Sequence, residues 1–78
     1  MTKMMIKLNS IKKIIGFVNI ADQYSGEISV ASGDHTVNGK SLLGIFSLDL
    51  KNNLTLEIES GTDLFSLIQK LDCAGIIC

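Results

Sequence analysis

The chain has 78 residues, a mass of 8.4 kDa and a net charge of −1, with 46% hydrophobic and 19% charged residues. A chain of this length buries roughly 60% of the surface of its unfolded state, and this composition excludes an intrinsically disordered protein. The lysines are spread along the chain, so no direct binding of nucleic acid is expected. No apolar run approaches the ~20 residues that span a bilayer, and no secretory signal is visible, which together predict a cytoplasmic protein without a membrane partner.

The first expected element is a strand, because apolar residues alternate with others at a period of two. The apolar positions are Met4, Ile6 and Leu8. A helix is expected from Ser10 to Tyr24, with one apolar face made of Ile11, Ile14, Ile15, Val18 and Ala21. Asn9 or Ser10 can cap its first turn, and Ser25-Gly26 ends it.

Two short strands follow in the prediction. Residues 27–32 alternate with Ile28 and Val30 directed inward, and Gly33-Asp34 suits a two-residue hairpin turn. The return strand covers residues 35–37. A tight Asn38-Gly39 turn then precedes a short helix from Ser41 to about Leu48.

The last strand is expected after a turn at Asn52-Asn53, with Leu54, Leu56 and Ile58 on its buried face. Ser60-Gly61-Thr62-Asp63 opens the final helix, where Asp63 in the first turn suits the helix macrodipole. Its apolar positions are Leu64, Leu67, Ile68 and Leu71. The order β-α-β-β-α-β-α predicts an α/β (α+β) open-faced sandwich, a four-stranded antiparallel sheet with three helices on one face, forming a single domain over residues 1–78.

The short helix is unusually apolar. Successive residues lie about 100° apart, so its five apolar side chains wrap most of the helix. They are Leu42, Leu43, Ile45, Phe46 and Leu48. We therefore expect an exposed apolar patch that docks partner proteins; the alternative is a helix sunk into the core or covered by the last helix.

Ser41 is expected at the start of this helix. The unpaired backbone N–H groups there form a good place for a phosphate. An ordinary N-cap, which stabilises a helix by roughly 1 kcal/mol, is the alternative role.

The stretch from Val37 to Leu48, VNGKSLLGIFSL, resembles the regulatory-serine region of the HPr family, the small phosphocarriers of the bacterial sugar phosphotransferase system. The resemblance implies an HPr-like fold for the whole chain. It also implies that Ser41 is a regulatory phosphosite for an ATP-dependent HPr kinase/phosphorylase. Partner binding is expected at Lys40, Leu42, Leu43 and Phe46, and the implied partners are that kinase, a catabolite-control repressor or an enzyme I-like docking surface.

The same resemblance identifies a departure in the first helix. In the family this helix opens with Gly-Leu-His-Ala-Arg-Pro-Ala, and the histidine receives phosphate from enzyme I. The ungapped counterpart is LNSIKKI at residues 8–14, so Ser10 stands at the histidine position and Lys12 at the arginine position. A serine hydroxyl needs an adjacent base, and lysine lacks the bidentate fork of arginine. No catalytic residue is therefore predicted.

His35 is the single histidine of the chain. We expect it to be a half-exposed residue of an edge strand; the alternative is a replacement phosphate acceptor. Cys73 and Cys78 do not have a zinc-binding spacing. We expect a small apolar side chain and a terminal thiol, with redox or metal chemistry as the alternative, and no cofactor.

The catabolite-repression HPr homologue also lacks the histidine, keeps the serine and can exchange elements to form dimers. By this likeness we predict a regulatory binding module, not an enzyme, that is a monomer or a homodimer. Two alternatives stay open. One is a functional phosphocarrier with a non-standard acceptor, and the other is a divergent structural copy with neither activity.

Overall fold

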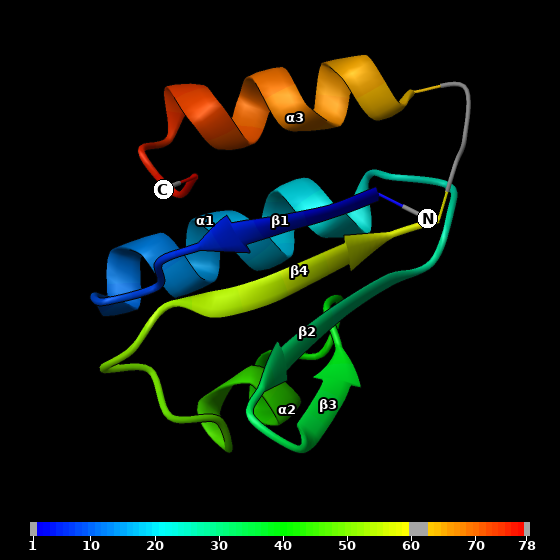
Figure 1. Cartoon of the computed structure of the whole chain (residues 1–78). Helices are drawn as coiled ribbons and strands as arrows, with labels where there is room; N and C mark the ends of the chain where they lie inside the picture. Colours follow the sequence, from blue (N-terminus) through cyan, green and yellow to red (C-terminus); the bar gives the residue numbers. More distant parts are fainter. Residues whose placement is uncertain (1, 60–62, 78) are drawn as a thin grey trace.

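The computed structural model describes residues 2–59 and 63–77. Within them, four strands form one antiparallel sheet that three helices cover (Figure 1). The elements are β1 (Thr2–Ile6), α1 (Ile11–Asp22), β2 (Ile28–Ser32), β3 (His35–Asn38), α2 (Leu42–Phe46), β4 (Leu54–Ile58) and α3 (Leu64–Cys73). The predicted open-faced sandwich is confirmed.

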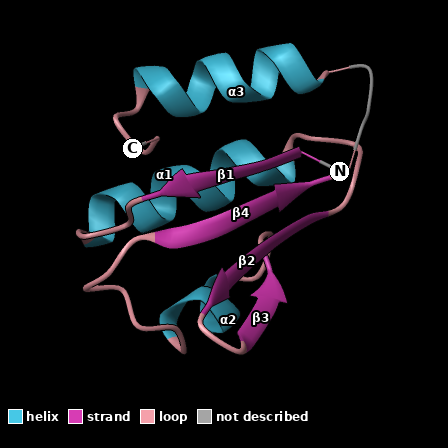
Figure 2. Ribbon diagram, in the orientation of Figure 1, coloured by secondary structure: helices cyan, strands magenta, loops and turns pink. Residues whose placement is uncertain are grey.

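The sheet has the order β1-β4-β2-β3, so β4 lies between two partners although it comes last in the sequence (Figure 2). Leu56 is in register with Met4 of β1 on one side and with Val30 of β2 on the other. On the open face, a polar row crosses all four strands through Lys3, Glu57, Ser29 and Asn38. Lys3 Nζ lies 3.4 Å from the Glu57 carboxylate. This polar face of the sheet is therefore compatible with exposure to solvent.

The core lies between the inner face of the sheet and the helices. Its fully enclosed side chains include those of Ile6, Leu8, Phe17, Val30, Ile45, Leu54, Leu56, Ile58, Leu71 and Ile76. The inward positions predicted for the strands are therefore confirmed. In α3 the predicted face is confirmed as well, with Leu67 and Leu71 buried.

Helix α1 presents a different face to the core from the predicted one. Its buried residues are Ile14, Phe17 and Ala21, which follow at i, i+3 and i+7. Ile11 and Ile15 are 66% and 46% exposed, so the prediction that they lie on the buried face is wrong. The helix carries more apolar residues than one stripe can hold, and the stripe that contains the Phe17 ring is the one that packs on the sheet.

Three helix boundaries differ from the prediction. Helix α1 ends at Asp22, before Tyr24, and α2 is confined to Leu42–Phe46. Asp63 is the N-cap of α3 and not part of its first turn, and its side chain makes no capping hydrogen bond.

The remaining predictions concern the cysteines and the turn before α3. Cys73, expected as a small apolar side chain, carries an exposed free thiol at the end of α3. Ser60-Gly61-Thr62 and Cys78 lie outside the described residues.

Across residues 2–59 and 63–77, no helix is long and apolar enough to cross a membrane. In the same ranges, His, Cys, Asp and Glu do not gather in threes that would hold a metal ion.

Two glycines fix the turns around β3. Gly33 has a φ of 59° in the two-residue turn between β2 and β3, as predicted. Gly39 follows β3, and its backbone N–H donates a hydrogen bond of 2.7 Å to the Ile28 carbonyl oxygen. A Cβ atom at Gly39 would lie 2.6 Å from Ile28 Cγ2, which leaves no room for a side chain.

We predict that Gly39→Ala lowers the free energy of unfolding by about 1–3 kcal/mol, because the added methyl group overpacks the contact with Ile28. Gly16→Ala is the matched control, since an added Cβ there meets nothing within 4 Å. In the α1 interior that control should raise stability by about 1 kcal/mol. Urea denaturation followed by circular dichroism measures both. Equal stability of Gly39→Ala and wild type would contradict the prediction.

Candidate partner-binding site

Ser41 is the N-cap of α2. Its backbone is extended, with φ −102° and ψ 110°, and its Oγ accepts a hydrogen bond of 3.2 Å from the Gly44 N–H. The turn before it is closed by the Ser41 N–H, which donates to the Asn38 carbonyl oxygen at 3.0 Å. The residue is half-exposed. Ser41 thus has the local role of a cap, and solvent still reaches part of it.

The apolar side chains of α2 divide between core and surface. Ile45 is fully buried and Leu48 nearly so, whereas Leu42, Leu43 and Phe46 are 39%, 83% and 45% exposed. A helix of five residues cannot turn all of them inward. The expected exposed patch is confirmed; its role in partner binding stays a prediction.

Ser10 is the N-cap of α1, and its Oγ accepts a hydrogen bond of 3.2 Å from the Lys13 N–H. Beside it lies a cavity of about 490 Å³, which we call the α1–α2 slot. The slot is lined mainly by Leu8, Ser10, Ile11, Ile14, Phe46 and Leu50. Residues 10 and 46, far apart in the sequence, therefore border the same cavity.

Ile11 borders the α1–α2 slot together with Phe46 and so extends the apolar surface from α2 onto α1. This extension was not predicted from the sequence, because Ile11 was expected on the buried face of the helix together with Ile15. The sequence did contain a signal for this exposure, because α1 has more apolar residues than one buried face can hold. Phe17 and Ile20 lie outside the predicted face and also pack in or against the core.

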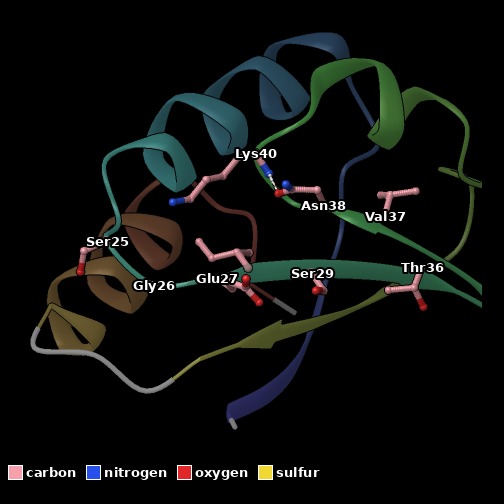
Figure 3. Close-up of a pocket in the computed structure, with 9 residues that line it drawn as sticks. Ser25, Gly26, Glu27, Ser29, Thr36, Val37, Asn38 and Lys40 are labelled. Carbon is pink, nitrogen blue, oxygen red and sulfur yellow. Dashed lines mark hydrogen bonds between the residues drawn. The ribbon is translucent and has the colours of Figure 1, made fainter.

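Lys40, predicted to bind partners, makes a contact within the protein. Its Nζ donates a hydrogen bond of 2.6 Å to the Tyr24 carbonyl oxygen. The buried Tyr24 in turn donates from its hydroxyl to the Glu59 carbonyl oxygen at 2.7 Å. Figure 3 shows the Lys40 side chain extended toward the loop at Ser25, while its backbone N–H is bonded to Asn38 Oδ1 at 2.9 Å. Lys40 therefore links the turn before α2 to the end of α1.

A polar cleft of about 480 Å³ borders Lys40. Glu27, Ser29, Thr36 and Asn38 contribute to its lining (Figure 3). None of these four residues belongs to the predicted set.

His35 lies at the opposite end of α2 from Ser41. Its Nε2 is 3.3 Å from Ser47 Oγ, and that hydroxyl donates to the Gly44 carbonyl oxygen. His35 is exposed on β3, which forms an edge of the sheet, so its expected place on an edge strand is confirmed.

Lysines flank the apolar surface. Lys12 is exposed in the first turn of α1, and Lys51 borders the α1–α2 slot. Among the described residues the structure records one ion pair, that of Lys3 with Glu57, and it lies on the other face of the sheet. The hydrogen-bond partners of the Ser10 and Ser41 hydroxyls are backbone N–H groups and not bases. A surface of exposed apolar side chains flanked by lysines is suited to docking.

A family model described as the PTS HPr component phosphorylation site matches residues 12–72. The chain belongs to the HPr family. Members of this family are phosphocarrier proteins of the phosphotransferase system and not catalysts. Curated protein sequences gave no match.

Solved HPr structures have the same fold. A structure of HPr-C-His from Thermoanaerobacter tengcongensis is 29% identical with a TM-score of 0.78, covering 94% of this chain and 89% of that one. An HPr dimer from the same organism is 32% identical with a TM-score of 0.67, covering 82% and 75%. The phosphocarrier protein HPr of Bacillus anthracis str. Ames, at 24% identity and a TM-score of 0.68, covers 94% and 92% and shows likeness of fold alone.

We predict that Lys40→Met lowers the free energy of unfolding by about 1 kcal/mol, because the Tyr24 carbonyl loses its donor. Lys51→Met is the control, since this ammonium makes no hydrogen bond among the described residues. Urea denaturation of both variants gives the comparison. If both substitutions lower the free energy of unfolding by the same amount, the hydrogen bond from Lys40 to Tyr24 has no net effect on stability.

Proposed function

We propose that this HPr-family protein is a regulatory binding module of the phosphotransferase system that does not relay phosphate through a histidine. Its regulated residue is Ser41, and its docking surface is formed by Lys40, Leu42, Leu43 and Phe46. It acts where ATP and an HPr kinase are available, in the cytoplasm. Its partners are proteins, and a second copy of the chain is among the candidates because one of the similar structures is an HPr dimer.

The loss of histidine transfer is proposed from Ser10, and this single observation carries the function. The family resemblance aligns Ser10 with the phosphate-accepting histidine. Its hydroxyl caps α1 by accepting from Lys13 N–H, and within residues 2–59 and 63–77 no base is bonded to it. A serine without a base is a weak nucleophile near neutral pH, and its phosphate ester is a poor donor.

The regulatory role is proposed from the position of Ser41 beside the exposed patch. A phosphate on Ser41 adds a charge of about −1.5 to −2. Because the Lys40 ammonium is bonded to Tyr24, that charge is left largely available to a partner. Phosphorylation would therefore place a strong anion at the edge of the apolar residues 42, 43 and 46 and change which proteins bind there.

We expect ATP and an HPr kinase to add one acid-stable phosphoryl group to the wild-type chain and none to Ser41→Ala. Phosphoenolpyruvate and enzyme I should leave the wild type unmodified. Intact-mass spectrometry before and after acid treatment measures both reactions. A histidine-containing HPr is the positive control for the enzyme I reaction.

Acid-labile phosphate after incubation with enzyme I would overturn the loss of histidine transfer. His35→Ala would then identify the acceptor, since this histidine is exposed. A chain unmodified in both reactions would support the divergent copy with neither activity.

We further predict that Leu43→Ser slows phosphorylation of Ser41 by roughly tenfold, because an exposed apolar contact to the kinase is lost. The thermal midpoint should not change, since the Leu43 side chain is mostly in water. Phe65→Ser is the matched control, as Phe65 is similarly exposed on α3. Initial rates at equal protein concentration provide the measurement. Equal slowing by both variants would exclude a specific contact at Leu43.

A further inference from the structure

The Asn38-Gly39 pair at the end of β3 has a reactivity that the proposed function does not use. It is the single Asn-Gly pair of the chain. The backbone nitrogen that follows an asparagine can attack the side-chain amide of that asparagine and close a cyclic imide. Glycine favours this reaction because it has no Cβ to hinder the approach of the two groups. The sequence therefore places a self-modifying pair shortly before Ser41.

Three hydrogen bonds hold this pair in the folded turn. The Gly39 N–H donates to the Ile28 carbonyl oxygen at 2.7 Å. The Asn38 carbonyl oxygen accepts from the Ser41 N–H at 3.0 Å. The Asn38 Oδ1 atom accepts from the Lys40 N–H at 2.9 Å, the bond drawn as a dashed line in Figure 3. Both groups that cyclisation would join, the Gly39 nitrogen and the Asn38 side-chain amide, are thus engaged.

The bond from Gly39 to Ile28 opposes the reaction directly. To attack, the Gly39 nitrogen must give up its proton and approach Cγ of Asn38, and that proton is held by the Ile28 carbonyl oxygen. Gly39 is buried, so water has little access to it. It also has little room to move, because a Cβ atom there would lie 2.6 Å from Ile28 Cγ2. The reaction is therefore confined to molecules in which the turn has opened locally.

We propose that Asn38 is a modification site that the fold protects and that reacts when this turn opens. The Gly39 nitrogen loses its proton and bonds to Asn38 Cγ, while the bond from Cγ to Nδ2 breaks and ammonia leaves with that proton. Water then opens the cyclic imide. Cleavage at the backbone carbonyl carbon gives isoaspartate, and cleavage at Cγ gives aspartate. Water is the one co-reactant of both steps.

Isoaspartate formation changes the path of the main chain. The chain then runs through the former side chain and is longer by one carbon, and the carbonyl oxygen that accepts from Ser41 becomes part of a free carboxylate. The close packing of Gly39 on Ile28 leaves no room for the added atom. Ser41 therefore loses its fixed place at the start of α2. This consequence rests on the proposed function, in which Ser41 is the residue that the kinase modifies.

The reaction rate in the purified full chain tests the protection. Peptide mapping by mass spectrometry follows the conversion of Asn38, and a synthetic peptide of residues 35–42 gives the unprotected rate. We expect the folded chain to react at least roughly 100-fold more slowly than the peptide. Hydrogen exchange of the Gly39 N–H, measured by NMR, should show the same protection within about tenfold, because one opening frees this group for both processes. A folded chain that reacts as fast as the peptide would overturn the proposal.

Lys40→Met loosens the turn without changing the reactive pair, because it removes the hydrogen bond of 2.6 Å to the Tyr24 carbonyl oxygen. The protection of Asn38 and that of the Gly39 N–H should fall together, by roughly fivefold, when the variant is compared with a peptide that carries the same substitution. Lys51→Met is the matched control and should leave both at the wild-type value. Faster exchange at Gly39 without faster modification of Asn38 would overturn the proposal.

The isoaspartate form, prepared by ageing the unfolded chain and separated by ion exchange, tests the consequence for the turn. Its free energy of unfolding should be lower than that of Asn38→Asp, which adds the same charge without lengthening the main chain. With ATP and an HPr kinase, it should be phosphorylated at least roughly tenfold more slowly than Asn38→Asp. Equal stability of the two forms would contradict the loss of the turn. A kinase that modifies none of these chains would overturn the proposed function alone, since the exchange, reaction-rate and stability measurements do not involve phosphorylation.

Discussion

The contact between Gly39 and Ile28 determines where the candidate site is built. Gly39 donates its N–H to the Ile28 carbonyl oxygen at 2.7 Å, and the absence of a Cβ allows the two backbones to approach. This contact holds the end of β3 against the start of β2. Ser41 follows two residues later, so the first turn of α2 has a fixed position relative to the sheet. The exposure of Leu43 and Phe46, on which docking depends, follows from that position.

Most of the fold could be predicted because each strand of the sheet has only one buried face. Alternation in residues such as Leu54, Leu56 and Ile58 encodes a strand directly, and all three are fully enclosed. Helix α2 was predictable for a related reason. Its five residues carry more apolar side chains than one face can hold, so exposure was required by geometry.

The errors arose where the answer depended on distant contacts. In α1, two apolar stripes are compatible with the periodicity, and the core packs the one with Phe17, leaving Ile11 and Ile15 in water. The internal contact of Lys40 was not predicted, because local sequence cannot reveal that its ammonium reaches the carbonyl of Tyr24, sixteen residues earlier. The role of Lys40 in partner binding stays a prediction. The juxtaposition of Ser10 with Phe46 at one cavity likewise depends on the packing of α1 and α2.

The pairing of β1 has a consequence for how this protein acquires its structure during synthesis. Its inner neighbour is β4, at residues 54–58, and on its other side Lys7 N–H donates to Ile76 and Ile6 forms a bridge with Ile77. During synthesis β1 therefore has no strand partner until β4 has been translated. Such long-range pairing slows folding. Met4 and Ile6 thus stay without their sheet partners until β4 has been made, and β1 can join the sheet only from that point on.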